Sequence, residues 1–489
     1  MAKRVAIIDI GSNSVRMVVY ERTSRFAFHL LHEAKSRVRI SEDAYKNNNN
    51  LQEVPMQRTF NALKEFLTIS SSFGVRKTLC VATSALRDAP NKKEFLQRVQ
   101  KELKLSIKVI DGTREAYLGA IACANLLPEQ HSALSIDIGG GSTEFAIINS
   151  KNVKNTISLK LGTVRLKELF FDKNRVDEAV EYIDSELEAL KDIDTSTLIG
   201  IGGTIRAISN AIMATNNYPL NKLHAYEYSC LEFSEFISKV LKADETELKK
   251  LGIKRDRFDV IKPGALILQR VVKKISIEKL LTSGVGVREG LYLSDLLRNS
   301  KDKFPHNYNT SIRYLLDSHL LDSNFSNQLN SLSKKLFDAT HEYLGLGIKY
   351  RRDLSIAAKL YPTGNSIHFY SKHKHSYYLI QNALEYGFTH KQIVLISTLV
   401  RYAKRKLPSS EHIDKYNILL PKKNTLNALS YLLSLTIALL SHKPRNIDFN
   451  IKFSDGVLKI ESKNTLYLSQ EAVEKLNSIK DFKVSFLSK

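Results

Sequence analysis

The sequence lacks the features that would place it in a membrane, in a disulfide-bonded fold or among Walker-type nucleotide-binding proteins. Its three cysteines, Cys80, Cys123 and Cys230, are far apart and have no metal-ligand spacing, which is typical of reduced thiols. The longest apolar segment, residues 426–440, is shorter than the roughly 18 residues that a membrane span needs. The apolar run near the N-terminus is too short for a signal-peptide core, and no G-x-x-x-x-G-K-[ST] loop occurs. We therefore expect a cytoplasmic protein that does not bind membranes.

Acidic side chains are scarce relative to basic ones, with 51 Asp and Glu against 73 Lys and Arg and a net charge of +22. The excess is uneven. Residues 1–300 carry 45 basic and 36 acidic side chains (+9), whereas residues 301–489 carry 28 and 15 (+13). This imbalance favours an anionic partner. Solvated surface charge that only keeps the protein soluble explains it equally well.

The sequence contains one internal repeat. Residues 6–19 ("AIIDIGSNSVRMVV") align without gaps on residues 134–147 ("LSIDIGGGSTEFAI"), which places Asp9 on Asp137 and Arg16 on Glu144. Each copy has an apolar strand, a tight turn and a second strand, which is the pattern of a β-hairpin. The repeat predicts two related halves.

The rest of the chain extends this organisation. Its 489 residues suit about three domains, since domains average roughly 150 residues. After each hairpin, strands mix with helices, so we expect two α/β domains, residues 1–130 and 131–304, that face each other across a cleft. Residues 305–445 have helical periodicity and few glycines, and residues 446–489 show a hairpin around an Asp-Gly turn followed by a helix.

The second hairpin brings two carboxylates together. If Gly140 and Gly141 form its turn, Asp137 lies directly opposite Glu144 on one face of the sheet. Opposed like charges are destabilising unless a cation lies between them or one is protonated, and Mg²⁺ prefers such oxygen ligands. The same pairing in the first copy sets Asp9 against Arg16, a pair that neutralises itself. Alternatively, the glycines only close a hairpin and Glu144 faces solvent.

Several glycine turns favour phosphate binding. The amides of Gly139 to Ser142 can bind phosphate oxygens, and the turn at residues 200–204 precedes a helix whose N-terminal amides attract anions. Residues 283–290 ("SGVGVREG") nearly match the dinucleotide pattern G-x-G-x-x-G, but the last glycine comes one place late. The sequence therefore favours several opposed turns over a single phosphate loop.

These motifs resemble those of the exopolyphosphatase and guanosine pentaphosphate phosphohydrolase family, within the actin, Hsp70 and sugar-kinase superfamily. The resemblance rests on "DIGSNSVRM", "ATSALRDA", "GTREAYLGA", "DIGGGSTEF", "GGTIRA" and "SGVGVREGLY", which cover residues 1 to about 298 in the family's order. The epsilonproteobacterial type is particularly similar. The resemblance implies two actin-like (ribonuclease H-like) domains and Mg²⁺-dependent hydrolysis of a terminal phosphoanhydride.

The resemblance also implies roles for individual residues. By motif position, Glu115 matches the catalytic acid that orients or deprotonates water, and Arg87 matches an active-site arginine. Without the resemblance, Glu115 would be interpreted as a helix-start carboxylate favoured by the helix dipole, and Arg87 as a surface arginine paired with Asp88. The metal-associated carboxylates are matched by Asp137 and Glu144, and the phosphate-binding loops by Ser12, Asn13, Gly139, Gly140, Gly141, Ser142, Gly202, Gly203 and Thr204.

The helical region resembles the family's HD-like domain through residues 372–383 and 397–408. It lacks the metal-binding dipeptide, because no His-Asp pair occurs in the sequence and Tyr361 and Pro362 stand at the expected place. We therefore expect a substrate-binding scaffold that forms a homodimer. Its basic runs "KHK" (372–374) and "RYAKRK" (401–406) are candidate polyanion contacts, or alternatively solvated helix surface.

The sequence leaves the substrate open between inorganic polyphosphate and guanosine pentaphosphate. Two other classes of function also remain: a polyphosphate or nucleic-acid binding protein without turnover, and an ATP-dependent kinase of the same superfamily. For the hydrolase, nucleic acid is not an expected partner.

Overall fold

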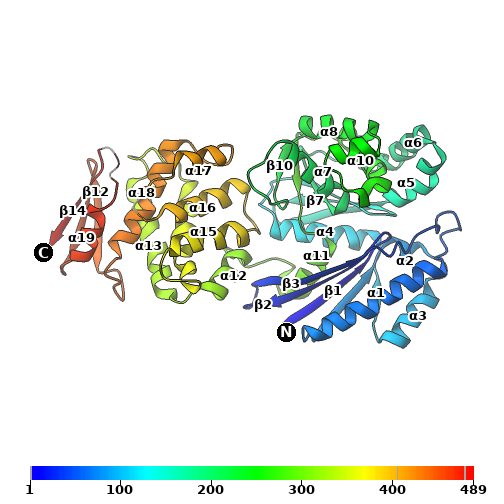
Figure 1. Cartoon of the computed structure of the whole chain (residues 1–489), viewed down its shortest axis with the longest axis horizontal. Coiled ribbons are helices and arrows are strands. Elements are labelled where there is room, and N and C mark those ends of the chain that lie inside the picture. Colours follow the sequence, from blue (N-terminus) through cyan, green and yellow to red (C-terminus); the bar gives the residue numbers. More distant parts are fainter. Residues whose placement is uncertain (1–2, 405, 478, 480, 489) are drawn as a thin grey trace. The chain divides into compact units, whose positions relative to one another are not determined.

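A computed structural model describes residues 3–404, 406–477, 479 and 481–488 (Figure 1). The chain divides into two compact units, Met1–Tyr308 and Asn309–Lys489. Within the described residues, no helix combines the length and the apolar character that a membrane span requires.

The first sheet of the first unit has the strand order β3-β2-β1-β4-β5. Strand β1 pairs antiparallel with β2 and parallel with β4. Alternate side chains of β1, such as Ile8 and Ile10, join a core with Phe60 of α1 and Phe95 of α3. The elements are β1 (Arg4–Ile10), β2 (Val15–Arg22), β3 (Phe28–Ser36), α1 (Glu53–Ser72), β4 (Lys77–Ala82), α2 (Ser84–Asp88), α3 (Lys92–Leu103) and β5 (Ile107–Val109).

The second sheet has the order β10-β11-β9-β6-β7-β8. One of its faces is covered by helices that share a large apolar core with β6, β9 and β11. Its elements are β6 (Ala133–Ile138), β7 (Thr143–Asn149), β8 (Asn152–Leu159), α5 (Thr163–Leu169), α6 (Val176–Leu187), β9 (Thr197–Ile201), α7 (Gly202–Thr215), β10 (Glu227–Ser229), α8 (Cys230–Lys242), α9 (Glu245–Lys250), α10 (Phe258–Lys274) and β11 (Lys279–Thr282).

Two helices lie between the sheets, α4 (Gly112–Leu126) and α11 (Val287–Leu296) (Figure 1). Leu118 of α4 and Val287 of α11 pack with Val81 of the first sheet, while Ala120 and Cys123 of α4 pack on the second sheet. The helices cross at Gly290, where a Cβ atom would lie 1.9 Å from the Leu118 carbonyl oxygen. Only glycine allows this close approach of two backbones.

The predicted hairpin register is confirmed in both copies. Asp137 pairs with Glu144 and Ile138 with Thr143, while the Gly139 amide donates to the Ser142 carbonyl at 2.9 Å. In the first copy, Asp9 pairs with Arg16. Because side chains alternate along a strand, this register sets the faces of all the polar residues near the two turns.

The second unit is helical and ends in a small three-stranded sheet of order β12-β13-β14, as predicted. The apolar segment at 426–440 is mostly a buried helix. Helices and sheet share one core, in which Phe449 and Ile460 pack with helical residues. Tyr361 and Pro362 are buried in a 3₁₀ turn. The elements are α12 (Thr310–His319), α13 (Ser323–Thr340), α14 (Tyr350–Leu360), α15 (Lys372–Ala383), α16 (His390–Tyr402), α17 (Ser410–Lys415), α18 (Lys423–Leu439), β12 (Phe449–Ser454), β13 (Val457–Ser462), α19 (Tyr467–Glu474) and β14 (Lys483–Ser488).

Candidate active site

An open cleft lies between the two sheets of the first unit. It is lined by the turns of both repeated hairpins, the first turns of α4 and α11, and the β9–α7 turn. The structure thus brings together segments that are far apart in the sequence. The sequence-predicted residues that line the cleft are Ser12, Asn13, Glu115, Asp137, Gly139, Gly140, Gly141, Ser142, Glu144, Gly202, Gly203 and Thr204.

Arg87 joins the α4 carboxylate to the second hairpin turn. Its guanidinium donates to Glu115 Oε2 at 2.9 Å and to Ser142 Oγ at 3.2 Å. The contact with Asp88, which the alternative interpretation favoured, is longer at 3.7 Å. The Asp111 side chain caps α4 by accepting from the Arg114 amide at 2.7 Å. This cap fixes the first turn of the helix, which carries Glu115. Arg87 therefore connects the predicted base to the predicted phosphate loop.

The environment of Glu115 favours proton binding. Burial raises the pKa of this carboxyl well above its ordinary value, and the nearby Glu144 raises it further, while Arg87 lowers it. The residue is 8% exposed. A buried carboxyl with a raised pKa, next to an arginine, suits a group that takes a proton at neutral pH.

The opposed carboxylates of the second hairpin are also buried. Burial, reinforced by Asp137, raises the pKa of Glu144 to about 7, and the Ser158 hydroxyl donates to Glu144 Oε1 at 2.9 Å. Burial raises the pKa of Asp137 to about 6. Glu144 is 3% exposed, so the alternative in which it faces solvent is wrong.

Asp137 lies against the third glycine turn. A Cβ atom on Gly202 would come within 2.5 Å of Asp137 Oδ1, and Gly202 has φ +90°. Both observations require glycine at this position. The second hairpin and the β9–α7 turn therefore meet at one carboxylate.

The described residues fit a divalent cation only as part of a larger shell. They contain no group of three or more His, Cys, Asp or Glu side chains arranged to hold a metal. Asp137 and Glu144 supply two carboxylates, which is the usual number for Mg²⁺ that takes its remaining ligands from water and phosphate. The pair thus suits a cation that arrives with an anionic substrate.

The cleft also contains cations that sequence reasoning missed. Burial and the nearby Arg288 and Arg206 lower the pKa of Arg16 to about 10. Arg206 donates to the Gly202 carbonyl at 2.9 Å. Crowded, buried cations indicate a site for an anion. The sequence carried a signal for three of these arginines, because the motifs "SNSVRM", "GGTIRA" and "GVREG" contain Arg16, Arg206 and Arg288. The basic residues that line the cleft are Arg16, Lys35, Arg206, Arg257 and Arg288.

The expected pairing of Asp9 with Arg16 is correct in register but wrong in contact. Arg16 instead forms an ion pair with Glu33, at 3.7 Å, and Glu33 also accepts from Arg288 at 2.8 Å. Burial raises the pKa of Asp9, and the nearby Arg288 and Arg16 offset only part of that increase. Strand β3 thus supplies the counter-charge that the hairpin alone was expected to contain.

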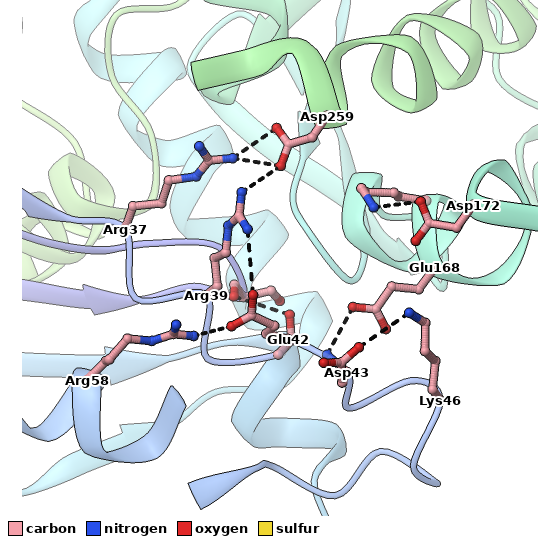
Figure 2. A network of polar contacts seen from close by, with 12 residues as sticks. Arg37, Arg39, Glu42, Asp43, Lys46, Arg58, Glu168, Asp172 and Asp259 are labelled. Atoms are coloured by element: carbon pink, nitrogen blue, oxygen red, sulfur yellow. Dashed lines mark hydrogen bonds and ion pairs between the residues drawn. The ribbon is translucent and has the colours of Figure 1, made fainter. Parts of the chain in front are cut away.

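A network of polar contacts joins the two halves of the first unit beside the cleft (Figure 2). Arg37 donates to both oxygens of Asp259 at 2.9 and 2.8 Å, and Arg39 donates to Asp259 Oδ2 at 2.9 Å. The Asp43 amide donates to Glu168 Oε1 at 3.2 Å. These partners are more than 120 residues apart in the sequence, so no local pattern could have revealed them.

The pKa of Glu144 predicts a pH-dependent stability. In protein treated with a chelator, we expect unfolding free energy to fall as pH rises from about 4.5 to 7, since the folded state binds the proton more tightly than the unfolded state. The loss should be on the order of 3 kcal/mol. Thermal melting of wild type and Glu144→Gln across this range measures it, and the variant should show a flatter profile. Equal pH profiles for the two proteins would contradict the assignment.

Comparisons with known proteins agree with this geometry. A profile of the Ppx/GppA phosphatase family matches residues 18–299, and a profile of Ppx/GppA phosphatase domain III matches residues 309–477. Similar solved structures include a Ppx/GppA family member from Aquifex aeolicus (29% identity, TM-score 0.54, covering 61% of this chain and 99% of that one). An exopolyphosphatase from Cytophaga hutchinsonii is also similar (25% identity, TM-score 0.57, covering 62% and 100%).

A curated relative is the bifunctional 3-dehydroquinate synthase/phosphatase of Fusobacterium nucleatum, which is 31% identical over 287 residues. The match covers 55% of this chain but only 43% of that protein, so this chain spans less than half of its relative. The predicted fold, with two actin-like α/β halves followed by a helical domain and a small terminal sheet, is confirmed.

Proposed function

The chain belongs to the Ppx/GppA phosphatase family, and on that premise we propose that it hydrolyses the terminal phosphoanhydride of inorganic polyphosphate or of guanosine pentaphosphate. The observation that carries the proposal is the buried Glu115 carboxylate, held at 2.9 Å by Arg87, whose guanidinium also binds the glycine-rich turn. This arrangement places a proton acceptor and a fixed cation beside a loop suited to phosphate.

In the proposed mechanism, the terminal phosphate binds at the hairpin turns, and Glu115 orients water and takes its proton as the water attacks phosphorus. Arg87 stabilises the charge that develops on the transferred phosphoryl group. Little covalent chemistry is needed, so positioning and electrostatic stabilisation supply most of the rate. The leaving group is the shortened polyphosphate or guanosine tetraphosphate.

We propose Mg²⁺ as the cofactor, held by Asp137 and Glu144. When bound, it would neutralise negative charge on the phosphate oxygens. The two carboxylates have pKa values of about 6 and about 7, so a cation would favour their ionised forms.

The basic residues of the second unit support a long polyanion, rather than a single nucleotide, as the proposed substrate. Burial and the nearby Lys404, Lys374, His375 and Lys372 lower the pKa of His373. Repelling cations from two separate segments therefore converge on one surface, which suits a chain of phosphates. Arg405, part of the predicted basic run, lies outside the described residues. Homodimer formation and cytoplasmic location stay predictions.

The proposal predicts orthophosphate release with no acceptor substrate present. We expect release with Mg²⁺ from long-chain polyphosphate and guanosine pentaphosphate, and a steeper loss of polyphosphate activity as salt rises from about 50 to 200 mM, since many spaced charges are screened together. Initial rates at several salt concentrations measure both effects.

Other outcomes of the same assay distinguish the alternatives. Binding of polyphosphate without release would identify a non-catalytic binding protein. Phosphate transfer from ATP to an acceptor, without hydrolysis, would identify a kinase. Equal salt dependence for the two substrates would contradict the extended polyanion surface.

A further inference from the structure

In the glycine turn of the second hairpin, the backbone carbonyl groups accept hydrogen bonds from one neighbouring element, helix α5. The first turn of α5 donates two backbone amides to Gly140 and one to Gly139, at 2.8 to 3.0 Å. The Gly141 carbonyl has a different donor, the Arg165 side chain, whose Nε lies 2.9 Å away. Three consecutive carbonyls therefore point toward α5.

This arrangement fixes the direction of the amides. In a trans peptide, the N–H points away from the carbonyl of the same unit. The N–H groups of Gly140, Gly141 and Ser142 therefore point away from α5, and all three residues line the cleft. Successive amides that point the same way form an anion-binding concavity. The carbonyl contacts thus orient the amides that the proposed function assigns to phosphate.

Arg165 is itself held on three sides. It is 9% exposed, its second nitrogen donates to Asp88 at 3.1 Å, and its guanidinium lies over the Tyr45 ring at 4.6 Å. Asp88 and Tyr45 belong to the first half of the unit, whereas Arg165 and Gly141 belong to the second. The orientation of the turn therefore depends on contacts from both halves.

One short helix reaches both sides of the same peptide. Arg87 of α2 donates to the Ser142 hydroxyl at 3.2 Å, and the next residue, Asp88, holds the arginine that binds the Gly141 carbonyl. The Gly141–Ser142 peptide joins these two contact points. Without them, the α5 amides would still hold the Gly139 and Gly140 carbonyls, but the peptide after Gly141 would lose these two contacts.

We infer that Arg165 is a positioning residue for phosphate: it holds the Gly141 carbonyl so that the Ser142 amide faces the bound anion, and Asp88 holds Arg165 in place. The inference rests on the proposed function for its kinetic consequence. Its consequence for phosphate binding is independent of the proposed function, because affinity for orthophosphate can be measured without turnover.

The test compares Arg165→Met and Arg165→Lys with wild type. We expect Arg165→Met to weaken orthophosphate binding, measured by calorimetry, about tenfold, the effect of losing one well-aligned donor. The KM for polyphosphate should rise by a similar factor. Arg165→Lys and Asp88→Asn should give intermediate values, since each keeps part of the contact.

A matched control separates positioning from stability. Arg270 pairs with Asp184 in the same half of the unit, with Nε at 2.7 Å from Oδ1, and neither residue lines the cleft. Arg270→Met should lower the melting temperature about as much as Arg165→Met and leave orthophosphate binding unchanged. Unchanged binding in Arg165→Met would overturn the inference. If wild type releases no phosphate but binds it in an Arg165-dependent way, the proposed function fails and the inference stands.

Discussion

Glu115→Gln should lower the rate of phosphate release about 1000-fold, because the amide cannot take the proton of the attacking water. Burial and Glu144 raise the pKa of Glu115, which favours proton transfer to this side chain. The substitution keeps the size of the side chain and lets its oxygen still accept from Arg87. Stopped-time assays of orthophosphate from polyphosphate measure the loss.

Two comparisons make this experiment decisive. Glu168→Gln alters another buried glutamate, 6% exposed, that accepts a backbone amide beside the cleft, and should retain near wild-type rates. Orthophosphate affinity should also survive in Glu115→Gln, since the glycine turn is intact. Similar rates for Glu115→Gln and wild type would show that Glu115 is not the base.

Gly290→Ala should strongly destabilise the first unit. The new Cβ would lie 1.9 Å from the Leu118 carbonyl oxygen and 2.5 Å from its carbon, and neither is a flexible side-chain atom. The two helices must move apart, which exposes part of the packing between the sheets. Overpacking of this kind costs about 3 kcal/mol or more, measurable by urea unfolding.

Gly119→Ala provides the control on the partner helix. Its Cβ would meet only the end of the Ile201 side chain, at 3.4 Å, and alanine favours the helical backbone. We expect its unfolding free energy to stay within about 1 kcal/mol of wild type. Equal stability of Gly290→Ala and Gly119→Ala would mean that the helix crossing tolerates a wider separation.

Much of the site could be predicted because its key geometry is local. A two-residue turn fixes strand register, so Asp137 had to oppose Glu144 once Gly140 and Gly141 formed the turn. The motif positions likewise placed Glu115 in the cleft. Where sequence neighbours decide the arrangement, the pattern was sufficient.

The contacts that orient these groups could not be predicted. Asp88 and Arg165 are 77 positions apart, and Arg37 and Asp259 are 222 apart, so only the tertiary fold brings them together. The same holds for Glu33, which attracts Arg16 away from the expected pairing with Asp9. Charge partners between distant elements depend on side-chain packing, which leaves no periodic signal in the sequence.

The crossing of α4 and α11 has a consequence for substrate length. Glu115 lies three residues before Leu118 on one helix, and Arg288 lies two residues before Gly290 on the other. Because their backbones are in contact, these helices fix the separation between the proton acceptor Glu115 and the cleft cation Arg288. On the proposed function, we therefore expect the two helices to set the minimum length of polyphosphate that the protein accepts.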